Sequence, residues 1–295
     1  MFANRELTAR LLTARDAFYE QLSPLDRQIL AVSSAPIDNA ALDAKLRASA
    51  LDWTPAEIEA LRASLAEAER AATAAGVTFR LPATIYLAKE SSAIYSGSAY
   101  TRCAAVFMPG ALPATILLHE LYHVMSRYNP GIRAELYALV GYRPCRVSSS
   151  SMGDDLKEVV ITNPDTDAFG ETCITLPNPA GQPVDYLPLV VGNGVYDGTP
   201  EGWTKILDTI LVELHENRPV VVDGKTKYRQ MVLPDYERAV GGNGLTEPMH
   251  PEELIALNLE QALIPDSQAA FDFPNAQLVR TVKDKFASLY SGVAP

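Results

Sequence analysis

The segment His119-Glu120-Leu121-Tyr122-His123 reads H-E-x-x-H, and it determines which fold and which chemistry we expect of this chain. On an α-helix, residues four positions apart lie on one face, about 40° apart around the axis. Both imidazoles can therefore reach one metal ion, and Glu120 lies where its carboxylate can take a proton from a metal-bound water. We expect His119 and His123 to bind a metal and Glu120 to act as general base. The alternative is a pair of ordinary core histidines.

The residues around this motif predict a helix that is buried. Pro113 suits the first turn of such a helix. Apolar residues would surround its axis on nearly every side, which is typical of a helix inside a protein core. A buried helix with two histidines and a glutamate must provide polar partners for them. The apolar residues are Ile116, Leu117, Leu118, Leu121 and Val124.

Two histidines do not complete a zinc site, because catalytic zinc usually has three protein ligands and a water. The extended pattern H-E-x-x-H-x-x-G-x-x-H fails here, since Ser126 and Asn129 occupy its glycine and third histidine positions. The other source is a glutamate on a later helix. Pro251 suits a first helical position, and Glu252 and Glu253 would then lie in the first turn, where the helix dipole favours acids.

The two motifs together, H-E-L-Y-H and His250-Pro251-Glu252-Glu253, resemble zinc metallopeptidases of the gluzincin type. They are more closely similar to a loosely described set of uncharacterised bacterial metallopeptidases. The resemblance covers roughly residues 100–265. It implies one Zn²⁺ per chain, with His119, His123 and Glu253 as ligands and Glu120 as general base.

The sequence departs from this family at one position. Gluzincins often carry an aspartate four residues after the ligand glutamate, bonded to a zinc-binding histidine. Here that position is Leu257, and Asn258 follows it. Either Asn258 or another group orients the imidazole, or Glu252 rather than Glu253 is the ligand.

The chain is expected to have an α+β fold with a zincin-like core, meaning a mixed sheet and the metal-binding helix. Residues 1–76 are rich in Ala and Leu with helical periodicity, and Thr54-Pro55-Ala56-Glu57 should begin a helix that ends near Gly76. Residues 77–295 would form the metallopeptidase domain, with a β-rich insertion at about 150–235. The expected strands before the metal helix are Val77–Leu81, Ile85–Leu87, Ala93–Tyr95 and Cys103–Met108, and a final helix should cover Asn275–Tyr290.

The segment Tyr100–Met108 is a candidate for the edge strand that binds extended substrate by backbone hydrogen bonds. Peptide hydrolysis also needs a donor that stabilises the oxyanion. Tyr236 and His250 are the candidates, because they flank the glycine-rich stretch Gly241–Gly244 before the third ligand. The alternatives are a packed aromatic ring for Tyr236 and a helix N-cap for His250.

Composition limits the partners and the compartment. A net charge of −11 argues against a nucleic-acid partner, which would require a basic surface. No run of 18 apolar residues is present, so we expect no membrane span. The first residues lack the features of a signal peptide, which fits a cytoplasmic protein or one secreted after removal of a leader. Cys103, Cys145 and Cys173 permit one disulfide, although buried reduced cysteines are the simpler interpretation.

These observations predict a zinc-dependent peptidase that acts on a peptide or protein substrate, with an oligomeric state that the sequence does not indicate. One alternative is a zinc-stabilised binding module, or a catalytically degenerate zincin without turnover. A second is a deformylase-like hydrolase, but that would require a cysteine ligand in an E-G-C-x-S setting, which the sequence around Cys103 lacks. A third is a protease that acts as an effector on proteins of another cell.

Overall fold

The computed structural model describes residues 1–166, 169–241, 250–264 and 276–290. The chain packs as two compact units, each built from three separate stretches of sequence. The division does not follow the expected boundary at residue 76, because the first four helices pack in one unit and the fifth packs in the other. The first unit comprises Met1–Trp53, Tyr86–Gly110 and Pro144–Met231, and the second comprises Thr54–Ile85, Ala111–Arg143 and Val232–Pro295.

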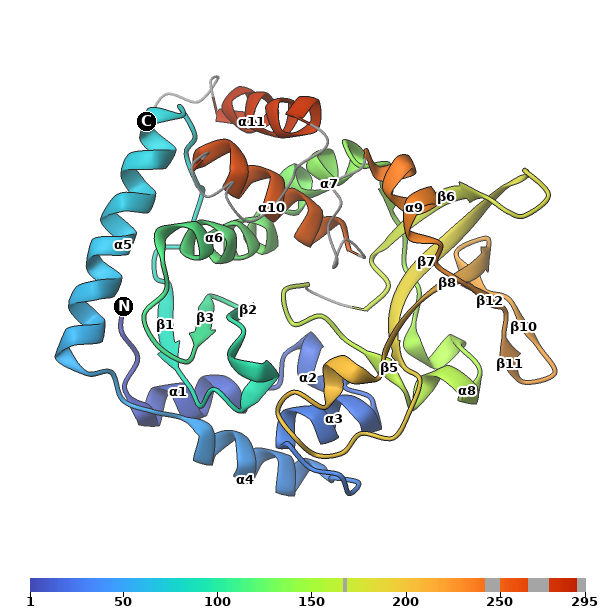
Figure 1. Cartoon of the computed structure of the whole chain (residues 1–295), viewed down its shortest axis with the longest axis horizontal. Helices are drawn as coiled ribbons and strands as arrows, with labels where there is room; N and C mark the ends of the chain where they lie inside the picture. The colour runs from blue at the N-terminus through green and yellow to red at the C-terminus, as the bar shows by residue number, and fades with distance from the viewer. Residues whose placement is uncertain (167–168, 242–249, 265–275, 291–295) are drawn as a thin grey trace. The chain divides into compact units, whose positions relative to one another are not determined.

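The first unit contains short helices from the N-terminal region and all but one of the strands that the structure describes (Figure 1). Strand β4 (Tyr142–Pro144) contains the point at which the chain passes from the second unit to the first. The remaining elements are α1 (Arg5–Leu12), α2 (Ala17–Gln21), α3 (Pro24–Ala31), α4 (Asn39–Ser49), β1 (Tyr86–Lys89), η1 (Ile94–Gly97), β2 (Tyr100–Arg102), β3 (Ala105–Met108), η2 (Ser149–Ser151), α8 (Asp154–Lys157), β5 (Val160–Ile161), β6 (Thr172–Pro177), β7 (Pro183–Gly192), η3 (Trp203–Lys205), β8 (Leu207–His215), β9 (Arg218–Pro219), β10 (Val221–Val222), β11 (Lys225–Thr226) and β12 (Tyr228–Gln230).

A small sheet in the first unit has the order β1-β3-β2. The central strand β3 runs parallel to β1 and antiparallel to β2. The segment Tyr100–Met108, expected as one edge strand, is therefore a hairpin, and only its β2 half lies at the sheet edge. The chain reverses at Cys103, which has a φ of 49°. The prediction of a single strand was wrong because the sequence shows no glycine at this turn.

A larger antiparallel sheet forms the expected β-rich region between the two motifs. It includes the strand order β12-β8-β7-β6, while β5 pairs with β7 and β9 pairs with β8. Alternate residues of β7 and β8 are buried together, as the two-residue period of a strand requires. These residues are Leu187, Leu189, Val191, Ile210, Val212 and Leu214. The Cys145–Cys173 disulfide packs in the same cluster, whereas Cys103 is exposed and forms no disulfide within the described residues.

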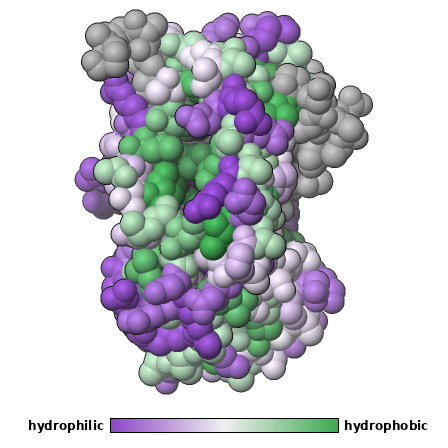
Figure 2. Space-filling model, turned by 90° about the vertical axis from the view of Figure 1, so that its left-hand side faces the viewer, coloured by the Kyte–Doolittle hydropathy of each residue, from purple (hydrophilic) through white to green (hydrophobic). Residues whose placement is uncertain are grey.

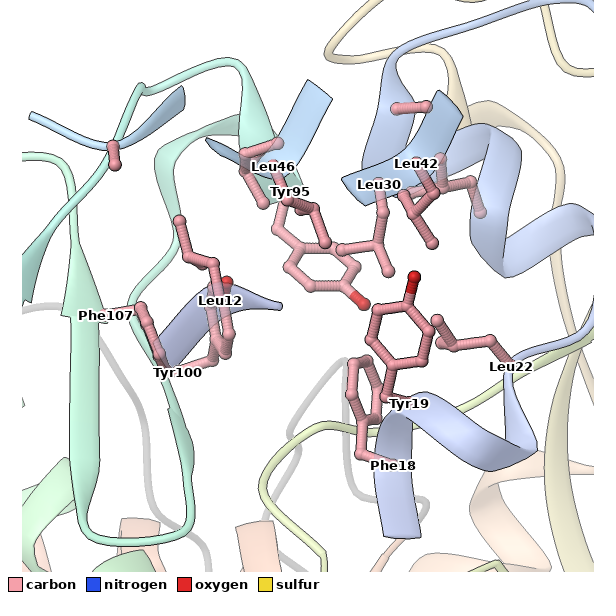
Figure 3. Packing of buried hydrophobic residues seen from close by; sticks show 14 of the residues in the cluster. Leu12, Phe18, Tyr19, Leu22, Leu30, Leu42, Leu46, Tyr95, Tyr100 and Phe107 are labelled. Atoms are coloured by element: carbon pink, nitrogen blue, oxygen red, sulfur yellow. The ribbon is translucent and has the colours of Figure 1, made fainter. Parts of the chain in front are cut away.

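The other apolar core of the first unit joins the N-terminal helices to the small sheet. Leucines of α1, α3 and α4 surround aromatic rings that come from α2, η1 and the small sheet (Figure 3). Tyr100 stacks on Phe107 with ring centroids 5.1 Å apart, and Tyr95 meets Tyr100 edge to face. The labelled residues are Leu12, Phe18, Tyr19, Leu22, Leu30, Leu42, Leu46, Tyr95, Tyr100 and Phe107.

The second unit is helical in the part of the chain that the structure describes, apart from the start of β4. Helix α6 lies next to α5, α7 and α10, and α11 packs against α10 and α7 (Figure 1). Phe286 of α11 contacts the rings of Phe79 and Tyr122, with centroids 6.0 and 6.1 Å away. The helices are α5 (Pro55–Ala74), α6 (Ala114–Tyr128), α7 (Pro130–Ala138), α9 (Leu233–Val240), α10 (Pro251–Leu263) and α11 (Ala276–Tyr290).

The predicted start and end of α5 are confirmed. Thr54 and Glu57 form a reciprocal capping box, and Pro55 occupies the first turn. At the other end, Gly76 has a φ of 69°, and the N–H of Val77 donates to the carbonyl of Ala72. This bond closes the helix, so the N–H of Val77 is not available to a sheet.

Two of the predicted strands are absent. Val77–Leu81 forms no strand, because Val77 completes the end of α5 and Phe79 packs on α11. Ala93–Tyr95 is also not a strand, since Tyr95 and Ser96 have φ values of 44° and 56° and lie in η1. In both segments tertiary packing overrides a β-type composition. The other two predictions are confirmed in part by β1 and β3.

The architecture therefore mixes helices and sheets, as expected at that level. Hydrophilic and hydrophobic residues are intermixed over the face of the surface shown in Figure 2. Within the described residues, no helix combines the length and the apolar character needed to cross a membrane.

A buried carboxyl group in the first unit predicts how stability depends on pH. Burial raises the pKa of Glu90 to about 8, although a hydrogen bond from Tyr100 and the charge of Arg102 act in the opposite direction. The folded chain therefore binds this proton more tightly than the unfolded chain, whose pKa is near 4.5. Protonation of Glu90 stabilises the fold fully at low pH, and the free energy of unfolding falls as pH rises from about 4.5 to 8.

We expect Glu90→Gln to reduce this loss. The measurement is urea unfolding at pH 5.5 and 8, in which the wild-type protein should lose more stability than the variant. Glu201→Gln, at an exposed position of the same unit, is the control and should follow the wild type. Equal losses in the wild type and Glu90→Gln would contradict the expectation.

Candidate metal centre

Helix α6 carries the H-E-x-x-H motif and is as buried as predicted. It begins at Ala114, one residue after the expected Pro113, which serves as its N-cap. His123 and Glu120 are buried with 1% and 3% exposure. His119 lies one turn before His123, and the two imidazole rings meet edge to face with centroids 4.6 Å apart. The helix therefore presents both histidines on one face.

Helix α10 brings the second motif against α6. His250 is the N-cap of α10, and Pro251 occupies the first turn together with Glu252 and Glu253. The positive end of the helix dipole favours both carboxylates in this position. Apolar residues bury the rest of the helix, which fixes the rotation of α10 and hence the direction of its acids. These residues are Leu254, Ile255, Ala256, Leu259 and Leu263.

Three predicted ligands converge at this interface between helices. The Glu253 Oε2 atom lies 3.1 Å from His119 Nε2 and 3.5 Å from His123 Nε2. One ligand atom from each of the three residues lies within 4.8 Å of the others. Two imidazole nitrogens and a carboxylate oxygen are a donor set that suits zinc among other divalent metals. The structure therefore contains a His/Glu group that can hold a metal ion, and its geometry does not identify the metal.

The opposite nitrogen of each imidazole faces a different carboxylate. His123 Nδ1 is 3.0 Å from Glu252 Oε1, and His119 Nδ1 is 3.6 Å from Glu260 Oε2. A carboxylate beside Nδ1 favours a proton on that nitrogen, which leaves the Nε2 lone pair available to a metal. Both histidines thus have the orientation in which metal-binding imidazoles are usually held.

The electrostatics of the group favour a cation at its centre. Burial lowers the pKa of His119, but the neighbouring carboxylates of Glu253 and Glu260 outweigh this effect and raise the pKa to about 9. Burial raises the pKa of Glu253, but the charge of His123 and the hydrogen bond with His119 hold the pKa well below its usual range. Without a metal, positive charge on an imidazole balances the ionised carboxylate. A metal ion can take over that role.

The structure bears on the alternatives that the sequence leaves open for the group that orients an imidazole. Asn258 does not contact either histidine, since its side-chain amide donates to the carbonyl of Leu254 at 2.7 Å. Glu252 lies at Nδ1 of His123, and Glu253 lies at the Nε2 atoms. Of these alternatives, the one in which Asn258 orients the imidazole does not fit, because a residue five positions after Glu253 turns away from the helix face that carries Glu253.

Tyr236 is a packed aromatic residue of α9. Its side chain is 1% exposed, and its hydroxyl is hydrogen-bonded to that of Tyr142 at 2.5 Å. Burial keeps the pKa of Tyr236 well above its usual range. The structure thus places this hydroxyl against Tyr142, and the alternative of a packed ring describes it better than an oxyanion donor. Residues 242–249, including most of the glycine-rich stretch, lie outside the described residues.

His250 serves as a helix cap in the structure. Its Nδ1 accepts a hydrogen bond from the backbone N–H of Glu252 at 3.1 Å, and its ring packs edge to face on Tyr137. Burial lowers the pKa of His250 to about 4, although Glu252 and Glu253 act in the opposite direction. The ring is therefore neutral at pH 7 and, with Nδ1 as acceptor, carries its proton on Nε2.

Sequence reasoning did not identify Ser126, Tyr137 or Glu260 as members of this centre. Glu260 follows Glu253 by seven positions, so the helical period places both on one face, and this spacing could have been noticed. Ser126 similarly follows His123 by three positions. Tyr137 comes from α7, and its arrival depends on the packing of α7 against α10, which no local spacing predicts.

Comparisons of this chain with models of protein families, with curated proteins and with solved structures find no match. Any function proposed for the chain therefore depends on its residues and their geometry.

The pair of tyrosine hydroxyls provides a test of the position of Tyr236. Tyr236→Phe leaves the buried Tyr142 hydroxyl without this partner, so we expect a loss of about 1–3 kcal/mol in the free energy of unfolding. The double variant Tyr142→Phe/Tyr236→Phe should lose less than the sum of the single variants, because no hydroxyl is then left alone. Chemical unfolding of the four proteins measures this coupling. Additive losses would show that the two hydroxyls do not interact.

Proposed function

We propose that this protein binds one Zn²⁺ per chain through His119, His123 and Glu253, and that it hydrolyses peptide bonds with Glu120 as general base. The observation that carries the proposal is the arrangement of the two imidazoles. Their Nε2 atoms meet at one oxygen of Glu253, while their Nδ1 atoms face other carboxylates. A histidine that only packs in a core does not require carboxylates at both of its ring nitrogens.

The donor set favours a catalytic zinc over a purely structural one. Structural zinc is usually closed by four protein ligands, most often cysteines and histidines. Two histidines and one glutamate leave a position for water or substrate. The group that can hold a metal ion, His119, His123 and Glu253, offers two nitrogen donors and one oxygen donor.

In this proposal a bound zinc ion would make a water more acidic and polarise the carbonyl of the scissile bond. Glu120 follows the ligand His119 directly in α6 and is buried. Its carboxylate takes the proton of the attacking water and then returns it to the leaving amine. His250 is the remaining candidate to stabilise the oxyanion, because its neutral ring carries a proton on Nε2.

The test of the proposal is Glu120→Gln, a substitution that preserves the size of the side chain but removes its basicity. We expect the variant to retain about one zinc per chain and to hydrolyse peptides at least about 100-fold more slowly than the wild type. The measurements are elemental analysis after dialysis against zinc and digestion of a peptide library. Cleavage at the wild-type rate would show that Glu120 is not the base.

Two further variants serve as controls for the effect of Glu120→Gln on zinc binding and on hydrolysis. Glu135→Gln makes the same chemical change at an exposed position of α7, and it should retain both zinc and hydrolysis. His119→Ala should lose both. A wild-type protein that holds zinc and melts at a higher temperature with it, yet cleaves nothing, would instead be a zinc-stabilised binding module or a degenerate zincin. A wild-type protein that binds no zinc would contradict the proposal entirely.

A further inference from the structure

Among the residues that the structure describes, the carboxylate of Glu252 has three polar neighbours, and they belong to two other helices. Its Oε1 atom faces His123 Nδ1 at 3.0 Å. Its Oε2 atom accepts a hydrogen bond from Ser126 Oγ at 2.7 Å and another from the hydroxyl of Tyr137. Ser126 and His123 lie on α6, whereas Tyr137 lies on α7. We name these residues, Glu252, Ser126 and Tyr137, the Glu252 cluster.

The Glu252 cluster is sealed from solvent. Glu252 is 1% exposed, Ser126 is 0% exposed and Tyr137 is 4% exposed. A carboxyl group that is buried in such a place needs hydrogen-bond partners that replace the lost water. The two hydroxyls donate to one oxygen of Glu252, so they also fix the plane in which the other oxygen approaches the imidazole. The orientation of Glu252 is therefore set before any metal binds.

This orientation has a chemical consequence for His123. With Oε1 of Glu252 at Nδ1, the imidazole proton is favoured on that nitrogen, and the lone pair remains on Nε2. Nε2 is the atom that faces Glu253 in the candidate metal centre. Glu252 and Glu253 are adjacent in sequence and both acidic, yet the turn of the helix gives them opposite sides of the same ring.

We infer that the Glu252 cluster is a positioning device for His123, in which Ser126 and Tyr137 hold Glu252 and Glu252 fixes the tautomer and direction of the imidazole. The inference rests on the proposed zinc site. Glu260 is a looser counterpart for His119, since its oxygen lies 3.6 Å from Nδ1, which is longer than a hydrogen bond. Zinc affinity should therefore depend on Glu252 more strongly than on Glu260.

The test compares Glu252→Leu with Glu252→Gln. Leucine has a similar size but offers no acceptor, so we expect zinc affinity to fall about 10–100-fold. Glutamine keeps an oxygen that can accept from Nδ1–H, and serine and tyrosine hydroxyls can rotate to suit its amide. The zinc affinity of Glu252→Gln should therefore remain within about threefold of that of the wild type. Competition with a chelator of known affinity measures all three proteins, and the exposed Glu69→Leu on α5 is the matched control.

Nitrogen-15 spectra of the imidazoles report positioning directly, and the chain has only four histidines to assign. In the zinc-loaded wild type, we expect His123 to show a protonated Nδ1 and a metal-bound Nε2. Glu252→Leu should lose this single pattern at His123, whereas Glu260→Gln should change the signals of His119 and leave those of His123 intact. If Glu252 had a purely structural role, Glu252→Leu would lower the melting temperature of the metal-free protein but would leave the nitrogen-15 signals of His123 and His119 unchanged.

The outcomes separate this inference from the proposed function. A folded Glu252→Leu that binds zinc as tightly as the wild type, with an unchanged His123 pattern, would overturn the positioning role and leave the zinc site standing. A wild type that binds no zinc would remove the proposed function itself. If Glu252→Leu does not fold, the zinc affinities of Tyr137→Phe and Ser126→Ala provide the test. Weaker zinc binding by both would support the inference, and unchanged affinity in both would overturn it.

Discussion

The convergence of two imidazole Nε2 atoms on one oxygen of Glu253 is the interaction on which the second unit depends. It lies between α6 and α10, in a region where water is largely excluded. Buried titratable groups are tolerated only when each has a partner. The centre meets this requirement with carboxylates on both sides of each ring. The packing of α10 on α6 and α7 is therefore tied to the same contacts that would hold a metal.

Much of this centre follows from the sequence because its two motifs are local. The spacing of His119 and His123 places them on one helical face, and Pro251 with its two following acids predicts the start of α10. The role of each acid does not follow in the same way. Which of Glu252 and Glu253 faces Nε2 depends on the rotation of α10, which is set by the burial of its leucines against other helices. The contribution of Tyr137 is even harder to predict from the sequence, because Tyr137 contacts Glu252 from a third helix.

The rest of the fold shows the same contrast between local and distant determinants. The ends of α5 were predictable, because Thr54, Pro55 and Gly76 act on their own backbone. The β-rich region was predictable because short apolar runs, such as residues 187–191, lie between stretches of turn-forming residues. The segment around Phe79 was not, since an apolar stretch after a helix suits a strand as well as a contact with α11. The turn at Cys103 and the Cys145–Cys173 disulfide likewise depend on packing that sequence spacing does not show.

The most direct measurement of the central claim is X-ray absorption at the zinc edge of the purified, zinc-loaded protein. The account predicts nitrogen and oxygen neighbours at about 2.0–2.2 Å, with the multiple-scattering signal of two imidazoles and no sulfur. Replacement of Glu253 by Gln should change this first shell, because one carboxylate oxygen is then lost. Sulfur neighbours at about 2.3 Å, or a spectrum without imidazole scattering, would contradict the assignment of His119, His123 and Glu253 as ligands.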